Sequence, residues 1–119
     1  MKFISTIILL TLISCNNSDL EIIKIPIDKT TIPKGIAVNP KNNDIYISSL
    51  HLDQLVRYNE VQNKTEIILN REDHGYSAGT DLGIYKNSLY ALGRYNRDSF
   101  AMLFIKNLYT DLTLSLIHI

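Results

Sequence analysis

Short apolar runs separated by polar turns dominate the middle of the chain. Four β-prone runs follow one another, at residues 35–38, 44–48, 54–58 and 65–69, and the segments between them mostly have turn length and turn composition. No window of ten or more residues in this stretch places apolar side chains at helical spacing. The pattern therefore predicts four antiparallel strands in a meander.

The same order of apolar and polar residues returns later in the chain. Residues 82–84 (LGI) follow residues 36–38 (IAV) by 46 positions, and residues 89–91 (LYA) follow residues 45–47 (IYI) by 44 positions. Residues 100–105 then supply a third strand of the second unit. A period of about 40–45 residues with four strands per unit is typical of a propeller blade.

The predicted fold class is therefore all-β, with antiparallel four-stranded blades of a partial β-propeller over residues 32–113. One blade takes in about residues 32–70, and a second takes in about residues 77–113. Because only two repeats are present, another kind of β-meander is the alternative that the pattern leaves open.

The start of the chain has the composition of an export signal. One Lys precedes a mostly apolar run from Phe3 to Ile13, which is shorter than the ~20 residues of a membrane-spanning helix. Residues 12–15 (LISC) resemble the bacterial lipobox, in which the signal is cut before the cysteine and the thiol is acylated. The sequence thus predicts a helical signal peptide over residues 1–14 and lipid attachment at Cys15. The alternative is an ordinary secretory signal followed by a free thiol.

Lipid attachment implies a location in the bacterial cell envelope, on its extracytoplasmic side. Cys15 is the only cysteine, so no internal disulfide is possible, and its acyl chains hold the domain on the membrane. Asn16 after the cysteine favours the outer membrane if the cell is Gram-negative. Residues 15–31 are predicted to be a tether, within which residues 20–27 (LEIIKIPI) are a candidate outer strand that closes the propeller ring.

The charge balance argues against one class of partner. The 12 basic and 12 acidic residues cancel, so the chain has no net field that attracts nucleic acid. The expected partners are the membrane, through acylated Cys15, and an unidentified small molecule or protein.

The first predicted blade resembles a known family. Residues 32–59 (IPKGIAVNPKNNDIYISSLHLDQLVRYN) are similar to one blade of the bacterial propellers grouped as SMP-30, gluconolactonase and NHL-repeat-like proteins, and residues 77–93 match loosely. The resemblance implies a six-bladed ring, of which about two blades are present, with ligands bound on one face. A membrane-anchored binding protein is the leading prediction. A metal-dependent hydrolase of lactones or esters is the alternative, and a scaffold without a ligand is a third possibility.

Polar side chains gather in two of the predicted loops. In the blade geometry that the resemblance implies, the loop after the second strand and the loop that joins the two units open onto the same face of the ring. Five side chains there are candidate ligands or acid–base partners through their nitrogen and oxygen atoms. They are His51, Asp53, Asp73, His74 and Asp81. The competing interpretation of each is a solvated loop residue.

One position departs from the pattern of the family. Its lactonases hold a divalent cation, such as calcium, partly through a Glu on the first strand of a blade. The matching position here is Lys34, between Pro33 and Gly35, and its protonated amine repels a cation. No metal site is therefore predicted on this strand, and a calcium cofactor follows only from the hydrolase alternative.

Residues 75–79 (GYSAG) match the nucleophile motif of serine hydrolases in form only. That motif needs a buried strand before the serine and a helix after it. Here the polar residues 70–73 (NRED) precede it and the strand-like residues 82–85 (LGIY) follow it. The stretch is interpreted as a loop between blades, with Gly75 and Gly79 as turn residues.

The last residues break the orderly alternation of the rest. Residues 114–119 (LSLIHI) resemble the translation of a transposase end sequence that is ligated to DNA during library preparation. We expect the natural chain to continue beyond residue 113 with further blades. The alternative is a genuine apolar C-terminal strand.

Overall fold

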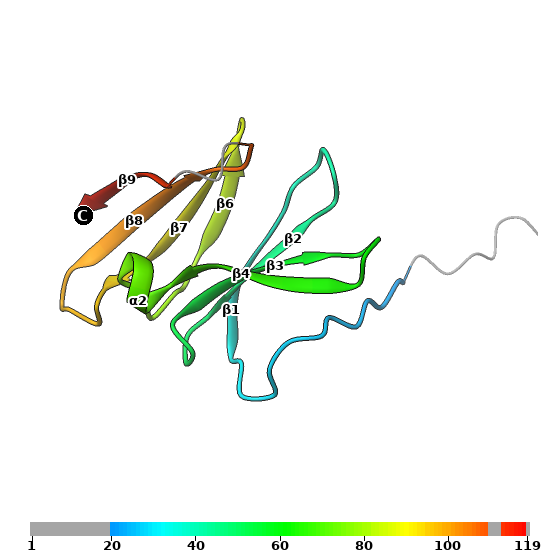
Figure 1. The fold of residues 1–119 in the computed structure, drawn as a ribbon, viewed down its shortest axis with the longest axis horizontal. Coiled ribbons are helices and arrows are strands. Elements are labelled where there is room, and N and C mark those ends of the chain that lie inside the picture. The colour runs from blue at the N-terminus through cyan, green and yellow to red at the C-terminus, as the bar shows by residue number, and fades with distance from the viewer. Residues whose placement is uncertain (1–19, 110–112, 119) are drawn as a thin grey trace, which may run out of the picture.

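The first half of the domain is one antiparallel sheet. The computed structural model describes residues 20–109 and 113–118, so the predicted signal peptide and Cys15 lie outside the described residues. The sheet contains β1 (Pro33–Val38), β2 (Ile45–Ser49), β3 (Gln54–Asn59) and β4 (Lys64–Asn70), in that spatial order (Figure 1). The predicted four-stranded meander is therefore confirmed.

Asparagine side chains shape the tight turns of this sheet. Asn43 and Asn63 have φ angles of 62° and 49°, in the left-handed region that Asn tolerates better than most residues. The Oδ1 atom of Asn42 accepts a hydrogen bond from the Asp44 N–H at 3.0 Å, which closes the turn before β2. The asparagines of these turns thus occupy positions where the backbone has a positive φ angle.

The second sheet has five strands, two of which lie one after the other along one edge, so it is also four strands wide. It contains β5 (Tyr76–Ser77), β6 (Leu82–Tyr85), β7 (Ser88–Tyr95), β8 (Ala101–Asn107) and β9 (Thr113–His118). Both β5 and β6 pair with β7 along the same edge. Between them, the Thr80 N–H donates to the Leu92 carbonyl and the Leu92 N–H to the Asp81 carbonyl, each at 3.0 Å. The two short strands therefore act as one interrupted edge strand.

The strand registers reproduce the sequence repeat. Ile36 pairs with Ile47 in the first sheet, and their counterparts Leu82 and Ala91 pair in the second. The offsets of 46 and 44 residues found in the sequence thus describe equivalent positions in space. The structure shows two antiparallel sheets in which equivalent residues pair in equivalent register.

The connection between the sheets differs from the predicted loop. Residues 71–74 form one helical turn, α2 (Arg71–His74), whose first turn is capped by Asn70 through a hydrogen bond from the Asp73 N–H to its Oδ1 at 2.7 Å. Gly75 ends the turn with φ of 74°, and its N–H donates to the Arg71 carbonyl at 2.9 Å. A helix this short has no apolar periodicity, so its sequence reads as a loop.

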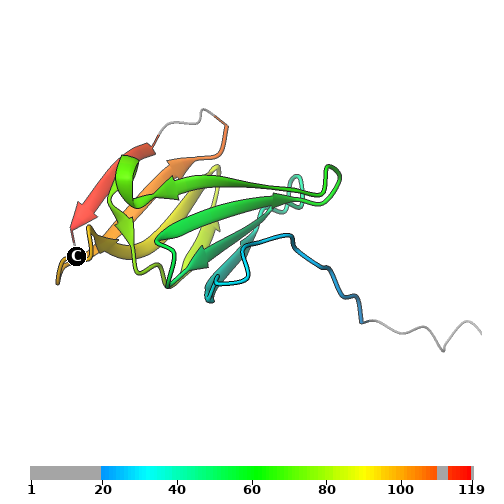
Figure 2. The ribbon, with the colours of Figure 1, turned by 60° about the horizontal axis from the view of Figure 1, so that its bottom comes forward.

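The main core lies between the two sheets, which Figures 1 and 2 show as separate layers. The buried side chains of this core are Tyr46, Leu55 and Leu69 from the first sheet and Tyr76, Leu89, Ala91 and Phe104 from the second. The rings of Tyr76 and Phe104 meet edge to face, with centroids 5.1 Å apart. The edge strands β1 and β6 lie side by side. Each sheet therefore buries one face against the other.

The N-terminal segment lies against the outside of the first sheet. Ile25 packs on a small cluster made by Ile45, Ile47 and Tyr58. The Pro26 carbonyl accepts a hydrogen bond from Thr65 Oγ1 on β4 at 3.0 Å. Within the described part of the chain, residues 20–32 pair with no strand. The ring-closing role of residues 20–27 stays a prediction.

At the other end, the backbone of β9 pairs antiparallel with β8. This pairing does not bear on whether residues 114–119 belong to the natural protein, which also stays a prediction. Among the described residues, no helix is long and apolar enough to cross a membrane.

Candidate functional site

The loops at one end of both sheets meet around Asp53. This residue ends the β2–β3 loop with φ of 52°, and its side chain is only 9% exposed. Its Oδ2 accepts a hydrogen bond from Arg97 Nε at 2.8 Å, and its Oδ1 accepts from Arg97 Nη2 at 2.9 Å. The Ala78 N–H also donates to Oδ1, at 3.1 Å. One buried carboxylate thus joins the first sheet to two segments of the second.

Arg97 is fixed by further contacts of the same kind. Its Nη2 donates to the His51 carbonyl at 3.3 Å, and its backbone N–H donates to Ser77 Oγ at 2.6 Å. The two guanidinium–carboxylate hydrogen bonds form a bidentate pair, which restricts both side chains. The β2–β3 and β7–β8 loops are therefore held together as one surface, which we call the loop face.

A second guanidinium group approaches the same carboxylate. Arg71 Nη1 lies 3.8 Å from Asp53 Oδ2, and the side chains of Arg71 and Arg97 are each 49% exposed. The two arginines together carry one more positive charge than Asp53 neutralises. The local charge of this trio is therefore positive.

A hollow of about 400 Å³ opens beside this trio. Its lining consists of Leu52, Asp53, Gln54, Ile67, Asn70, Arg71 and Glu72. Two apolar side chains, Leu52 of the β2–β3 loop and Ile67 of β4, thus lie beside charged and amide groups from the β2–β3 loop, β3, β4 and α2. The hollow offers an apolar surface with an exposed guanidinium and an exposed carboxylate at its edge.

The five side chains predicted from the sequence do not form one cluster of ligands. His51 is exposed and contributes its backbone carbonyl to Arg97, and Asp81 contributes its backbone carbonyl to the β7 ladder. Asp73 caps α2 together with Asn70, and His74 Nδ1 accepts a hydrogen bond from the Asn70 N–H at 3.1 Å. In residues 20–109, no group of three or more His, Cys, Asp and Glu side chains is arranged to hold a metal ion.

The sequence pattern does not predict the two arginines of this site. Arg97 lies 44 residues from Asp53 in the chain, and a single Arg in a polar loop gives no signal of its partner. The cue that exists is the repeat, because the β2–β3 and β7–β8 loops occupy equivalent positions in the two units and the separation of Asp53 and Arg97 equals the 44-residue offset of residues 45–47 and 89–91. A contact between them depends on how the sheets stack, which the sequence pattern does not specify.

Ser77 has no role as a nucleophile in this geometry. It is buried in β5, its hydroxyl donates to the Arg94 carbonyl at 2.9 Å, and it accepts from the Arg97 N–H. A strand follows a helical turn here, which is the reverse of a nucleophile elbow. Burial also raises the pKa of the neighbouring Tyr76 hydroxyl, so that phenol stays protonated. Both groups serve packing.

Lys34, the residue in place of the expected Glu, is exposed on β1. It lies at the side of a shallow apolar hollow of about 220 Å³, whose other lining residues are Pro33, Gly35, Ile36 and Ile47. This hollow is on the outer side of the first sheet, and Asp53 does not line it.

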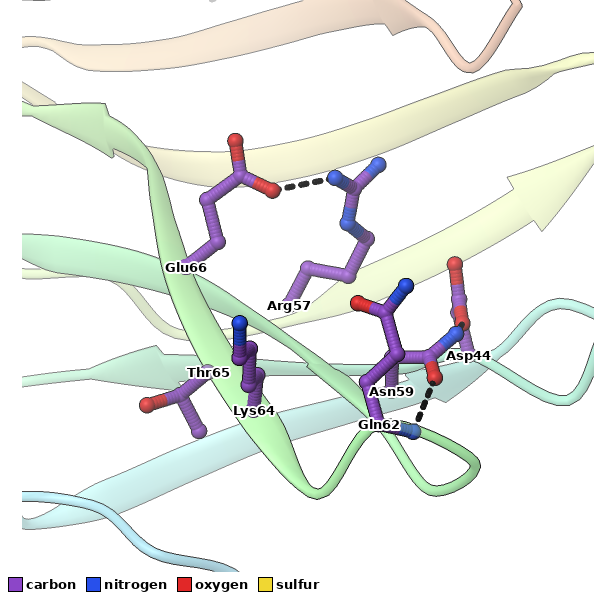
Figure 3. Close-up of a pocket in the computed structure, with 7 residues that line it drawn as sticks. All are labelled: Asp44, Arg57, Asn59, Gln62, Lys64, Thr65 and Glu66. Atoms are coloured by element: carbon purple, nitrogen blue, oxygen red, sulfur yellow. Dashed lines mark hydrogen bonds and ion pairs between the residues drawn. The ribbon is translucent and has the colours of Figure 1, made fainter.

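A second polar hollow, of about 480 Å³, lies at the opposite end of the first sheet (Figure 3). It is lined by Asp44, Arg57, Asn59, Gln62, Lys64, Thr65 and Glu66. Arg57 and Glu66 form an ion pair across β3 and β4, and Asn59 Nδ2 donates to Asp44 Oδ1 at 2.9 Å. Most of its polar groups are thus paired with one another.

No family model matches the chain, and no curated protein matches it significantly.

Proposed function

We propose that the chain is part of an envelope-anchored β-propeller lipoprotein whose loop face binds a small molecule or a protein segment. The observation that carries this proposal is the pairing of Asp53 with Arg97, because it joins loops of both sheets into one surface beside the 400 Å³ hollow. In this reading the two sheets are consecutive blades. Their matched registers and the adjacent edge strands β1 and β6 support it.

The charges at the hollow define the ligand class. Asp53 is already neutralised by Arg97, which leaves the half-exposed guanidinium of Arg71 with N–H donors for an anion. Glu72 lines the same hollow and is an acceptor. The site therefore suits a ligand that carries a carboxylate or phosphate group beside a hydrogen-bond donor.

The metal-dependent hydrolase is not proposed, because no observation favours it. Lys34 is exposed on the outer side of the first sheet, and the one buried acidic side chain of the loop face is engaged by arginine.

Arg71 is expected to bind the anionic group of the ligand. The labelled chain, prepared without residues 1–14 and with Cys15→Ser, is titrated with citrate, whose carboxylates lie beside a hydroxyl group. We expect NMR shift changes at residues 70–72 and 52–54, and we expect Arg71→Gln to weaken binding by about tenfold, since a charge-assisted hydrogen bond is lost. Lys64→Gln is the matched control, because it removes the same charge from the other polar hollow. Equal affinities for Arg71→Gln and the unsubstituted chain would contradict the assignment.

Cys15 is expected to carry the acyl chains that anchor the protein to the membrane. We expect Cys15→Ser in the full chain to abolish incorporation of a labelled fatty acid and to move the protein from the membrane fraction to the soluble fraction, because the acyl chains are the proposed anchor. Asn17→Ser, two residues further on, is the control and should change neither result. A chain that stays on the membrane without ever taking up the acyl label would refute lipid attachment.

A further inference from the structure

Both sheets also meet at the end opposite the loop face. The β1–β2, β3–β4 and β6–β7 turns lie there together with the segment that follows β8, and we call this surface the turn end (residues 39–44, 60–64, 85–87 and 106–109). Lys41 Nζ donates a hydrogen bond to Asn87 Oδ1 at 3.0 Å, and the Leu108 N–H donates to the Asn87 carbonyl at 2.9 Å. Turns of both sheets are therefore joined into one surface.

Lysine is the commonest charged residue of the turn end. Three of its lysines are exposed and the fourth, at the end of β8, is partly buried; they are Lys41, Lys64, Lys86 and Lys106. The acidic side chains in the described part of this end are Glu60 and Asp44, and Asp44 is buried and accepts hydrogen bonds from two asparagines. The described residues of the turn end therefore carry a net charge of +2.

Exposed aromatic and apolar side chains lie among these lysines. Tyr85 is 65% exposed, Tyr109 is 54% exposed, and Val61 in the β3–β4 turn is 94% exposed. Lys86 Nζ lies 5.5 Å from the centre of the Tyr85 ring. Lys41 Nζ lies 5.3 Å from the centre of the Tyr109 ring. Tyrosine and lysine together are typical of a membrane–water interface, because ring and stem contact the apolar layer while hydroxyl and ammonium groups stay among the headgroups.

The N-terminal segment reaches the sheets from the side of the turn end. Ile25 packs where β2 begins and β3 ends, and the Pro26 carbonyl accepts from Thr65 at the start of β4. The segment then runs toward the loop face, where the Ile32 carbonyl accepts from a backbone N–H of the β2–β3 loop at 3.0 Å. Figures 1 and 2 show the first described residues, in blue, leaving beside the β3–β4 turn. An anchor on Cys15 therefore attaches on the side of the turn end.

We propose that the turn end docks on an anionic lipid surface and holds the loop face away from the membrane. The lysines contact the lipid phosphates, and Tyr85, Tyr109 and Val61 enter the headgroup layer. Further blades would pack on the faces of the sheets, so the turn end stays accessible in a longer chain. The inference rests on the proposed lipid anchor, which keeps the lipid surface close and makes weak docking sufficient.

A polarity-sensitive dye tests the docking on the full chain. The dye is attached to Val61→Cys at the turn end or to Ser99→Cys in the β7–β8 loop, which are both exposed positions. The chain is isolated from the membrane fraction and placed in vesicles of phosphatidylcholine, or of an equal mixture with phosphatidylglycerol. We expect the emission at residue 61 to shift to the blue in the anionic vesicles alone, and the emission at residue 99 to stay unchanged. Salt at about 1 M should abolish the shift, because it cuts the Debye length to ~3 Å.

Lysine substitutions test the role of charge. Each lysine near an anionic surface is expected to raise the ratio of docked to undocked chains about fivefold, so Lys64→Gln with Lys86→Gln should lower that ratio about 25-fold. The matched control is Lys34→Gln with Arg94→Gln, which removes the same charge from exposed positions outside the turn end and should leave the shift unchanged.

The chain whose only cysteine is Cys15 separates failure of the anchor from failure of the docking. An acylated Cys15 takes up no dye, so dye on this chain would refute lipid attachment, and the comparison of residues 61 and 99 would then be repeated with Cys15→Ser. Absence of a shift at residue 61, or equal shifts at residues 61 and 99, would overturn the docking. A shift that survives Lys64→Gln with Lys86→Gln would also overturn it.

Discussion

Replacing Gly35 with alanine is expected to lower the free energy of unfolding by about 1–3 kcal/mol, the cost of overfilling a packed interior. The added Cβ atom would lie 2.0 Å from the Thr80 carbonyl oxygen and 2.8 Å from Ser48 Oγ. The first of these is a backbone atom on the opposite sheet, so relief requires the two sheets to move apart. That movement also breaks the bridge in which Ser48 Oγ accepts from the Gly35 N–H and donates to the Thr80 carbonyl, each at 2.8 Å.

Gly83 supplies the matched control for this prediction. It occupies a strand position like Gly35, but a Cβ atom there meets nothing within 4 Å. Gly83→Ala is therefore expected to be neutral or to stabilise by about 0.5–1 kcal/mol, because alanine loses less backbone entropy on folding. Denaturant unfolding followed by circular dichroism, on the chain without residues 1–14 and with Cys15→Ser, measures both variants. Equal stability of the two would show that the sheets do not approach closely at Gly35.

The second large effect is expected at Asp53. Asp53→Asn keeps a side chain that tolerates the φ of 52° but removes the charge that Arg97 engages. Asp53 is buried and Arg97 is half exposed, so we expect a loss of about 1–2 kcal/mol, between the values for exposed and buried ion pairs. The loops of the two sheets should separate first, because Asp53 also accepts from the Ala78 N–H. Faster amide hydrogen exchange at residues 77–80 reports that separation.

An exposed ion pair in the same molecule is the control for Asp53→Asn. Glu66→Gln removes the partner of Arg57, but Glu66 is 62% exposed and water replaces the interaction. Its expected cost is below about 1 kcal/mol, without a change in exchange at residues 77–80. If Asp53→Asn costs no more than Glu66→Gln, the buried pair does not hold the loop face together.

The strands were predictable because their signal is local. Alternation of apolar and polar residues and asparagine-rich turns were enough to place all four strands of the first sheet within two residues of their observed bounds. The offset between residues 36–38 and 82–84 also predicted which positions are equivalent, and the registers confirm it. Each of these inferences depends on side chains close in sequence or on exact repetition.

The loop face was not predictable in the same way. Of the five predicted residues, Asp53 is the one whose side chain joins the two sheets, and its partner Arg97 lies in the equivalent loop of the second unit. Asp73 and His74 take part in the capping of α2, which is too short to give a periodic apolar pattern in the sequence. Contacts between loops of different sheets depend on how the sheets stack. A single sequence does not encode that stacking in any local pattern.

If the two sheets are consecutive blades of a larger propeller, as we propose, the native gene must encode further blades, and reading it beyond codon 113 with long, adapter-free sequencing tests this directly. We expect the native gene to encode, in place of residues 114–119, further units of about 40–45 residues with the same strand pattern, whose sheets cover the uncovered faces of the two sheets. A native gene that encodes residues 114–119 and then stops would contradict it.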